Sequence, residues 1–135
     1  MNLLLVLQLF SCFSLTGLIW LVQLVHYPSF TYVEEKGFDQ FAKFHADKIS
    51  FIVVPLMILD LLSAVMLASQ YGWLNVALLV IVFLSTAVWS VPCHKKLQMH
   101  GKDLKCIKKL VLTNWPRTII WTVRSLIWCF VLLQV

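Results

Sequence analysis

The sequence predicts an all-α fold, an integral membrane four-helix transmembrane bundle with a short cytoplasmic interfacial amphipathic helix between spans 1 and 2. Two observations carry this prediction. Hydrophobic residues make up 61% of the 135 residues and charged residues only 13%, proportions outside those of soluble domains. The apolar residues also fall into four long runs, and about 20 such residues span about 30 Å of hydrocarbon as a helix. We therefore expect one transmembrane domain, residues 1–135.

The four runs are residues 2–25, 51–69, 73–91 and 110–135. Their continuous apolar character favours helices in lipid and excludes the alternating pattern of a β-barrel. The first run has no basic N-terminal region and is longer than a signal-peptide core, so we expect it to remain as a span. Between the first two runs, Phe38, Phe41 and His45 repeat at helical spacing among charged residues, which predicts the interfacial helix.

Two prolines bear on where the last two spans begin and end. We expect Pro92 to stop the third helix, because proline lacks the amide donor that a helix interior needs. Pro116 has two interpretations. It is either a first-turn proline behind a capping Asn114, or a kink inside a helix that runs unbroken from Asp103.

Lysine residues lie in only two regions of the chain. The connection 28–50 holds three and the connection 93–109 holds six, whereas the ends of the chain hold none. The positive-inside rule therefore predicts that both connections are cytoplasmic and both termini outside. The net charge of +5 indicates attraction to the anionic headgroups of the lipid bilayer, and no recognition motif suggests a nucleic-acid partner.

The fourth run contains two arginines inside an otherwise apolar stretch. Asn114, Arg117, Trp121 and Arg124 are spaced by three, four and three residues, so they share one helical face. A charge at the bilayer centre costs about 2.5 to 3.5 kcal/mol, so we expect this face to point into the bundle and to find partners. Asp60 is the acidic partner expected at that depth. Two cations and one anion leave one positive charge over.

This excess charge has two interpretations. In the structural one, Asp60 pairs with one arginine, and Gln23, Asn114 and carbonyl groups satisfy the other. In the functional one, a cytoplasm-facing polar pocket binds a small lipophilic ligand with an anionic or carbonyl group, and the protein is a candidate membrane oxidoreductase. The candidate ligand-binding residues are Arg117, Arg124, Asn114, Gln23, Trp121 and Trp20, and the candidate catalytic residues are Asp60 and His26.

Three histidines are expected at one depth near the cytoplasmic surface. His26, His45 and His94 follow the first span, lie on the interfacial helix and end the third span, respectively. Three converging imidazoles are a candidate metal site, although histidines are also ordinary residues at a membrane interface. The cofactor is open between a metal ion and a quinone, and a haem between His26 and His94 is a further alternative.

Two segments carry a family resemblance. "GLIWLVQLVHYPSF", residues 17–30, and "TNWPRTIIWTVRS", residues 113–125, together resemble a family of small four-span bacterial membrane proteins, which implies the bacterial inner membrane. The Asn-x-x-Arg-Thr core at Asn114, Arg117 and Thr118 is similar to the anthrone-oxygenase-like membrane family. That second resemblance implies oxygenation of a polycyclic phenolic substrate, with Asn114 and Arg117 at the matching positions.

Two other classes of function remain open on the sequence. A transporter or channel subunit would use the buried charges as a path, and four spans would then need a homo-oligomer to surround it. A non-enzymatic assembly or interaction protein would instead pair these charges with another protein. Whether the chain is an enzyme is therefore left open.

Overall fold

The computed structural model describes residues 3–134, and in that range all regular structure is helical. The first rod begins with α1 (Leu3–Leu21) and continues through a π-helical turn, η1 (Val22–His26), into the short α2 (Tyr27–Ser29) and the 3-10 turn η2 (Phe30–Tyr32). The second is α3 (Phe38–Tyr71). The third joins α4 (Leu74–Ser85), the π-helical η3 (Thr86–Ser90) and α5 (Val91–His100), and the fourth is α6 (Leu104–Leu132).

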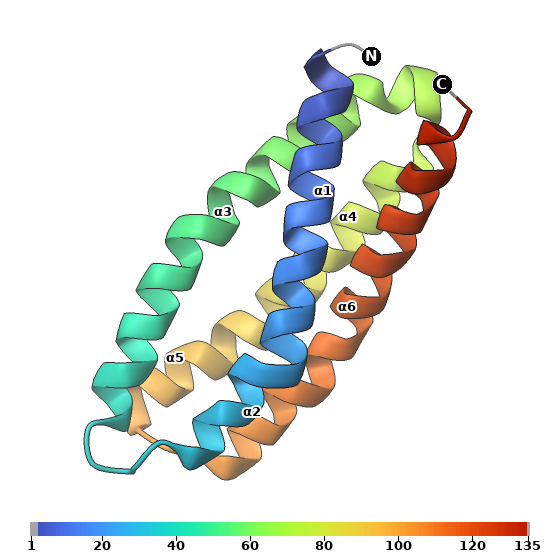
Figure 1. The fold of residues 1–135 in the computed structure, drawn as a ribbon. Helices are drawn as coiled ribbons and strands as arrows, with labels where there is room; N and C mark the ends of the chain where they lie inside the picture. The colour runs from blue at the N-terminus through green and yellow to red at the C-terminus, as the bar shows by residue number, and fades with distance from the viewer. Residues whose placement is uncertain (1–2, 135) are drawn as a thin grey trace.

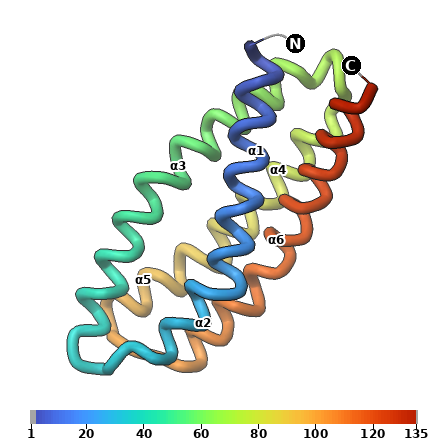
Figure 2. Tube along the Cα trace, in the orientation of Figure 1, coloured from blue at the N-terminus to red at the C-terminus, as the bar shows by residue number. Residues whose placement is uncertain are grey.

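The rods run alongside one another, and the chain reverses at each connection (Figure 1). The α3–α4 turn lies at the same end as both termini, and the loop before α3 and the α5–α6 turn lie at the opposite end. The trace in Figure 2 shows α1 beside both α3 and α6, in agreement with the contacts between these helices. Every connection is short, so each rod packs against its neighbours along most of its length.

Three of the rods are long and apolar enough to cross a membrane, namely Leu3–Tyr32, Phe38–Tyr71 and Leu74–His100. This finding supports a membrane protein. The fourth rod, α6, has 29 residues, but its two arginines and its other polar residues make it less apolar than the other three. A fourth crossing, and with it a transmembrane bundle of four helices, stays a prediction at this point.

The separate interfacial helix predicted between the first two spans is wrong. Phe38, Phe41 and His45 instead form the first turns of α3, which continues without a break to Tyr71. Gly37 starts this helix with a φ of 83°, a left-handed conformation that glycine adopts without steric cost. No glycine or proline follows until Pro55, so the amphipathic part and the apolar part join as one 34-residue helix.

Neither proline ends a helix. Pro92, predicted to stop the third helix, lies in the first turn of α5 directly after η3, and the rod continues to His100. Pro116 lies inside α6, which agrees with the interpretation that the helix runs unbroken from Asp103. The Asp103 carboxylate caps α6 by accepting hydrogen bonds from the amides of Lys105 at 2.9 Å and Cys106 at 3.1 Å.

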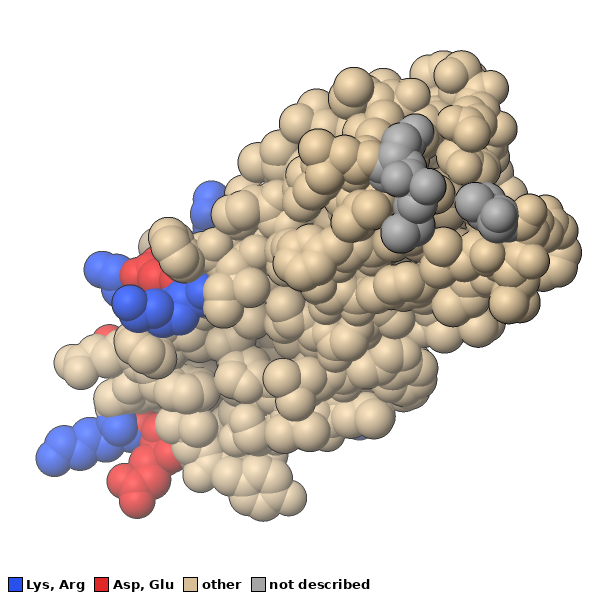
Figure 3. All heavy atoms as spheres, turned by 45° about the horizontal axis from the view of Figure 1, so that its top comes forward, with Lys and Arg blue, Asp and Glu red and all other residues tan. Residues whose placement is uncertain are grey.

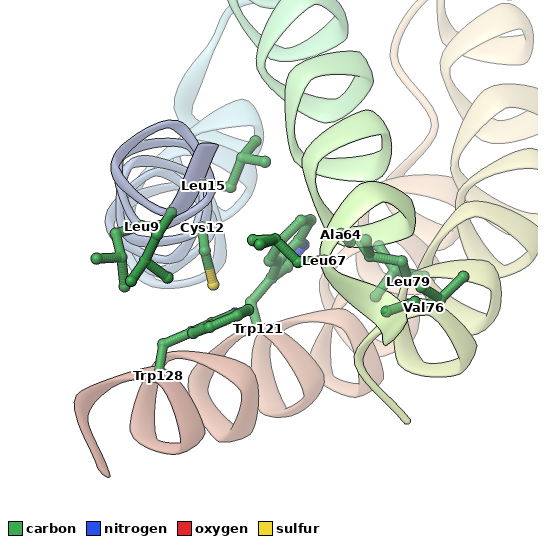
Figure 4. Packing of buried hydrophobic residues seen from close by; sticks show 12 residues of the cluster. Leu9, Cys12, Leu15, Ala64, Leu67, Val76, Leu79, Trp121 and Trp128 are labelled. Atoms are coloured by element: carbon green, nitrogen blue, oxygen red, sulfur yellow. The ribbon is translucent and has the colours of Figure 1, made fainter. Parts of the chain in front are cut away.

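The apolar core has two parts, one toward each end of the rods. In the first, Trp121 and Trp128 project from α6 toward α1 and α3, where they meet Cys12 and Leu67 (Figure 4). The second surrounds Phe30, which is completely buried, and joins the first and second rods to α5 and α6. The polar residues considered next lie between these two clusters and beside them.

The surface separates into two zones. Lysine, aspartate and glutamate side chains gather at one end of the visible face, and the rest of that face shows almost no charge (Figure 3). Large apolar side chains are exposed along the rods, for example Phe10 on α1, Met66 on α3 and Leu84 on α4. An apolar flank of this extent is typical of a protein surface that contacts lipid.

Candidate functional site

Arg124 and Asp60 form a closed ion pair in which both side chains have no exposed surface. The guanidinium donates from Nη1 to Asp60 Oδ2 at 2.7 Å and from Nη2 to Oδ1 at 3.1 Å, while Nε donates to Asn75 Oδ1 at 2.8 Å. Gln8 and Ser11 add hydrogen bonds to Asp60 Oδ1. With all these donors and acceptors matched, the network is a structural tie between α1, α3, α4 and α6.

Arg117 lies seven residues earlier on the same face of α6 and is bonded very differently. Its side chain is only 5% exposed, yet Nε and Nη2 have no hydrogen-bond partner among the described residues. Nη1 makes one long hydrogen bond of 3.5 Å to the Thr86 hydroxyl, and the ion pairs that the structure describes leave Arg117 out. The Tyr27 hydroxyl is a close polar neighbour. Arg117 is therefore a buried cation without a carboxylate partner among the described residues, and its polar neighbours are the Thr86 and Tyr27 hydroxyls.

A cavity of about 70 Å³ lies in front of Arg117. All four rods contribute to its walls, which are apolar except for Arg117, the Thr86 hydroxyl and the indole of Trp121. Since a water molecule takes about 30 Å³ in the liquid, the space has room for about two water molecules or for one small polar headgroup. The arrangement of one cation in an otherwise apolar chamber suits a ligand with a single anionic or carbonyl end.

Both π-helical turns of the described chain reach this cavity, one through Val22 and the other through Thr86. In each turn a backbone amide bonds five residues back, from Tyr27 to Val22 and from Val91 to Thr86. A proline follows directly in both cases, and the ring of proline crowds the carbonyl four residues earlier. The wider turn relieves this conflict, and such π-turns occur frequently at functional sites.

The other predicted ligand-binding residues lie in three different places: beside both arginines, in a buried hydrogen-bonded pair, and at the surface. Trp121 is shared, because it lines the cavity of Arg117 and also lies under the Arg124 guanidinium, 4.6 Å from the ring centre. Gln23 and Asn114 are buried but bond to each other at 2.8 Å and do not line the cavity. Trp20 is 36% exposed and donates to the Thr122 hydroxyl on the outer side of α6.

The two predicted catalytic residues lie in different surroundings. Asp60 lies apart from the cavity wall, and four hydrogen bonds already occupy its carboxylate oxygens. His26, at the end of η1, is partly buried and contacts His45. A catalytic role for either residue stays a prediction.

The three predicted metal-binding histidines do come together, from η1, α3 and α5. His26 Nε2 and His45 Nδ1 are 2.5 Å apart, and the rings of His45 and His94 have centroids 5.6 Å apart. Two nitrogens bound to one tetrahedral zinc would be about 3.3 Å apart, so the closest pair has the spacing of a hydrogen bond rather than of a chelate. No group of three ligands with metal-binding geometry occurs within residues 3–134.

Four residues of these sites were missed by the sequence reasoning. Gln8 and Asn75 complete the Asp60–Arg124 network, Thr86 bonds to Arg117, and Tyr27 donates to or accepts from His94 Nε2 at 3.0 Å. Gln8 and Thr86 had a usable signal, since each is a polar residue inside an apolar run. Asn75 and Tyr27 lie near helix ends, where polar residues are ordinary.

The chain matches no protein-family model, no curated protein and no solved structure. The two family resemblances stated above therefore stay expectations.

Proposed function

We propose that the chain is a four-span membrane protein in which Arg117 binds the anionic or carbonyl end of a small lipophilic ligand. The observation that carries the proposal is the buried guanidinium with two unpartnered nitrogens at an apolar cavity. Leaving hydrogen-bonding groups of a charged side chain buried and unpaired costs free energy, typically 1 to 3 kcal/mol or more for each group. A ligand oxygen that accepts those hydrogen bonds would recover that free energy.

The division of α6 into two faces supports a fourth span. Asn114, Arg117 and Arg124 point inward and are at most 5% exposed. The outward stripe is apolar, and its residues are 56–64% exposed: Leu112, Ile119, Leu126 and Phe130. Polar residues inside and apolar residues outside is the pattern that lipid imposes, because a charged side chain is tolerated in a span only when it faces the bundle. The clustering of lysines at one end favours a cytoplasmic position for that end.

The shape and chemistry of the cavity limit the ligand. One cationic wall group and an apolar remainder favour a carboxylate, a phenolate or a quinone carbonyl attached to an apolar body. The small volume suits the headgroup alone, so the rest of the ligand would extend between the rods toward lipid. The lysine-rich end would recruit anionic amphiphiles to the membrane surface nearby.

The test is to purify the wild-type protein and Arg117→Met in mild detergent and to identify the co-purifying small molecules by mass spectrometry. We expect a lipophilic acid, phenol or quinone at near-equal molar amount in the wild type and its loss in the variant. The control is Lys108→Met, which removes one positive charge from an exposed position of the same helix. Metal content is measured on the same samples, since three imidazoles lie next to the site.

If no molecule co-purifies, binding is measured directly with a para-nitrophenol that carries an alkyl chain, followed by its absorption spectrum. We expect saturable binding to the wild type and to Lys108→Met and at least about tenfold weaker binding to Arg117→Met, equivalent to about 1.4 kcal/mol. Equal binding to all three proteins would contradict the proposal.

A further inference from the structure

We propose that Tyr27, His94, His45 and His26 form a proton path that connects the Arg117 cavity to the lysine-rich end, so that the bound ligand is a phenol or another weak acid that gives up a proton there. This inference rests on the proposed function, because it needs a ligand at Arg117. It adds the chemical class of that ligand and a role for four residues that binding alone does not use.

The path begins beside the guanidinium. The Tyr27 hydroxyl lies close to Arg117, and the Tyr27 side chain is only 6% exposed. The same hydroxyl is 3.0 Å from His94 Nε2, a distance suited to proton transfer. Tyr27 does not line the cavity, so a ligand would meet its hydroxyl only beside the guanidinium of Arg117, and from there the hydroxyl would pass a proton to the imidazole of His94.

The path continues through the other two histidines. The rings of His94 and His45 lie side by side with centroids 5.6 Å apart and planes inclined by 35°. A ring rotation or one bridging water closes this gap. His45 then contacts His26 directly through Nδ1 and Nε2, 2.5 Å apart. Phe30 packs edge-on against His26 and His45 and helps to hold the two rings in this orientation.

Two open hollows meet the path, one at His26 and His45 and one at His94. One, of about 270 Å³, is lined by His26, His45 and Lys48, and the other, of about 290 Å³, is lined by His94, Asp47 and Lys95. Asp47, Lys48 and Lys95 are exposed, so we expect water to reach these hollows. The remaining ionisable or polar neighbours along the path are Arg117, Cys93 and the Ser90 hydroxyl, which lie near Tyr27. The acidic side chain beside the path is Asp47, which lines the hollow at His94, whereas Asp60 is held by Arg124.

The chemistry balances without an oxidant or a reductant. The ligand hydroxyl transfers its proton to the Tyr27 oxygen while the Tyr27 hydroxyl proton moves to His94 Nε2, which leaves a phenolate at Arg117 and an imidazolium at His94. The unpaired guanidinium stabilises the phenolate, because it is the cation in the cavity wall. The imidazolium then loses its proton through His45 and His26 to water, and the reverse sequence protonates the ligand again.

The experiment uses the alkyl para-nitrophenol described above, since its phenolate absorbs visible light. Protein with bound probe is subjected to a rapid pH jump, and the absorbance reports how fast the phenol and phenolate forms interconvert. In the wild type we expect relaxation faster than the mixing time of the instrument. In Tyr27→Phe and His94→Ala we expect relaxation about 100-fold slower, a typical contribution of a positioned proton-transfer group. Adding free imidazole should restore much of the rate in His94→Ala, because the small ring fits the space that the substitution leaves.

The control is His100→Ala, which removes an exposed histidine outside the path and should leave the rate unchanged. The imidazole rescue separates proton transfer from a structural effect, since a damaged fold would not recover. Loss of probe binding in Arg117→Met with unchanged relaxation in Tyr27→Phe and His94→Ala would overturn the proton path alone. Equal probe binding to wild type and Arg117→Met would instead overturn the proposed function beneath it.

Discussion

Arg117 and Arg124 lie seven residues apart on one face of α6, and both are buried, but their surroundings are opposite. Arg124 forms three hydrogen bonds to Asp60 and Asn75 and stacks on Trp121. Arg117 forms one long hydrogen bond and faces a cavity. Two residues of the same type on the same helix face therefore have different physical roles.

The difference shows how to separate a structural charge from a functional one. A buried pair with matched hydrogen bonds fixes the arrangement of helices, and removing one partner is costly because the other is left uncompensated. A buried charge without an oppositely charged partner costs stability, which is why we propose a ligand at Arg117.

Arg124→Met should cause the largest loss of stability. The substitution keeps the apolar length of the side chain but leaves the Asp60 carboxylate buried without its cation. We expect the free energy of unfolding to fall by about 3 to 5 kcal/mol, measured by thermal or denaturant unfolding in detergent. The double variant Arg124→Met/Asp60→Leu should recover a large part of the loss, because both charges are then gone. A single variant as stable as the wild type would contradict the structural role.

Arg117→Met should have the opposite profile. The substitution removes a guanidinium with two unpaired nitrogens from an apolar cavity, so stability should stay within about 1 kcal/mol of the wild type or increase. Ligand or probe binding should weaken at least about tenfold. The two quantities are measured on the same preparation, by unfolding and by absorbance titration. A large loss of stability would mean that Arg117 is structural like Arg124 and would remove the contrast.

Trp121→Leu should affect both stability and binding, because the Trp121 side chain contacts Arg124 and also lines the cavity of Arg117. Loss of the stacked ring beneath Arg124 removes a desolvated cation–π contact of about 2 kcal/mol, and the cavity of Arg117 changes shape at the same time. We therefore expect a moderate drop in melting temperature together with weaker probe binding. Trp128→Leu is the matched control, since Trp128 is equally buried but does not line the cavity. It should lower stability without changing binding.

The sequence was sufficient for the parts of this contrast that depend on spacing and hydropathy. Run length identified three helices that can cross a membrane, and the three-and-four spacing put both arginines on one face of α6. Asp60 was also expected at the depth of the arginines, and it forms an ion pair with Arg124. These features follow from helix periodicity alone, so they need no knowledge of the neighbouring rods.

The sequence did not show which of the two arginines pairs with Asp60. It depends on Asn75 and Gln8, which reach the Asp60 network from other rods, and such contacts are set by packing rather than by spacing along the chain. Pro92 was also misjudged, because a π-helical turn absorbs its conflict with the preceding carbonyl instead of ending the helix. The Asp60 network lies where four rods meet, and the π-helical turn before Pro92 reaches the Arg117 cavity through Thr86.

Asp103 carries an exposed charge, and its substitution should have the smallest effect on stability. A hydrogen bond from the Lys96 ammonium, 2.6 Å away, holds the pKa of the Asp103 carboxyl below its usual range, with help from the amides of Cys106 and Lys105. The pKa of the Asp103 carboxyl is lower in the folded protein than in the unfolded chain, so the ionised carboxylate stabilises the fold. This stabilisation is complete above the unfolded pKa of about 3.9 and is lost as the pH falls through the pKa of the folded protein.

Asp103→Asn keeps a capping side chain but removes the charge, so we expect the melting temperature at neutral pH to fall by about a degree or two. The difference between the two proteins should shrink as the pH falls through the lowered pKa of the folded Asp103 carboxyl and disappear below it, where the wild-type carboxyl is also neutral. A difference that persisted there would assign the effect to the amide itself. The side chains of Lys96 and Asp103 are 54% and 29% exposed, so solvent screens their attraction. The exposed pair of Lys96 and Asp103 therefore contributes little to stability, whereas the buried pair of Arg124 and Asp60 contributes much.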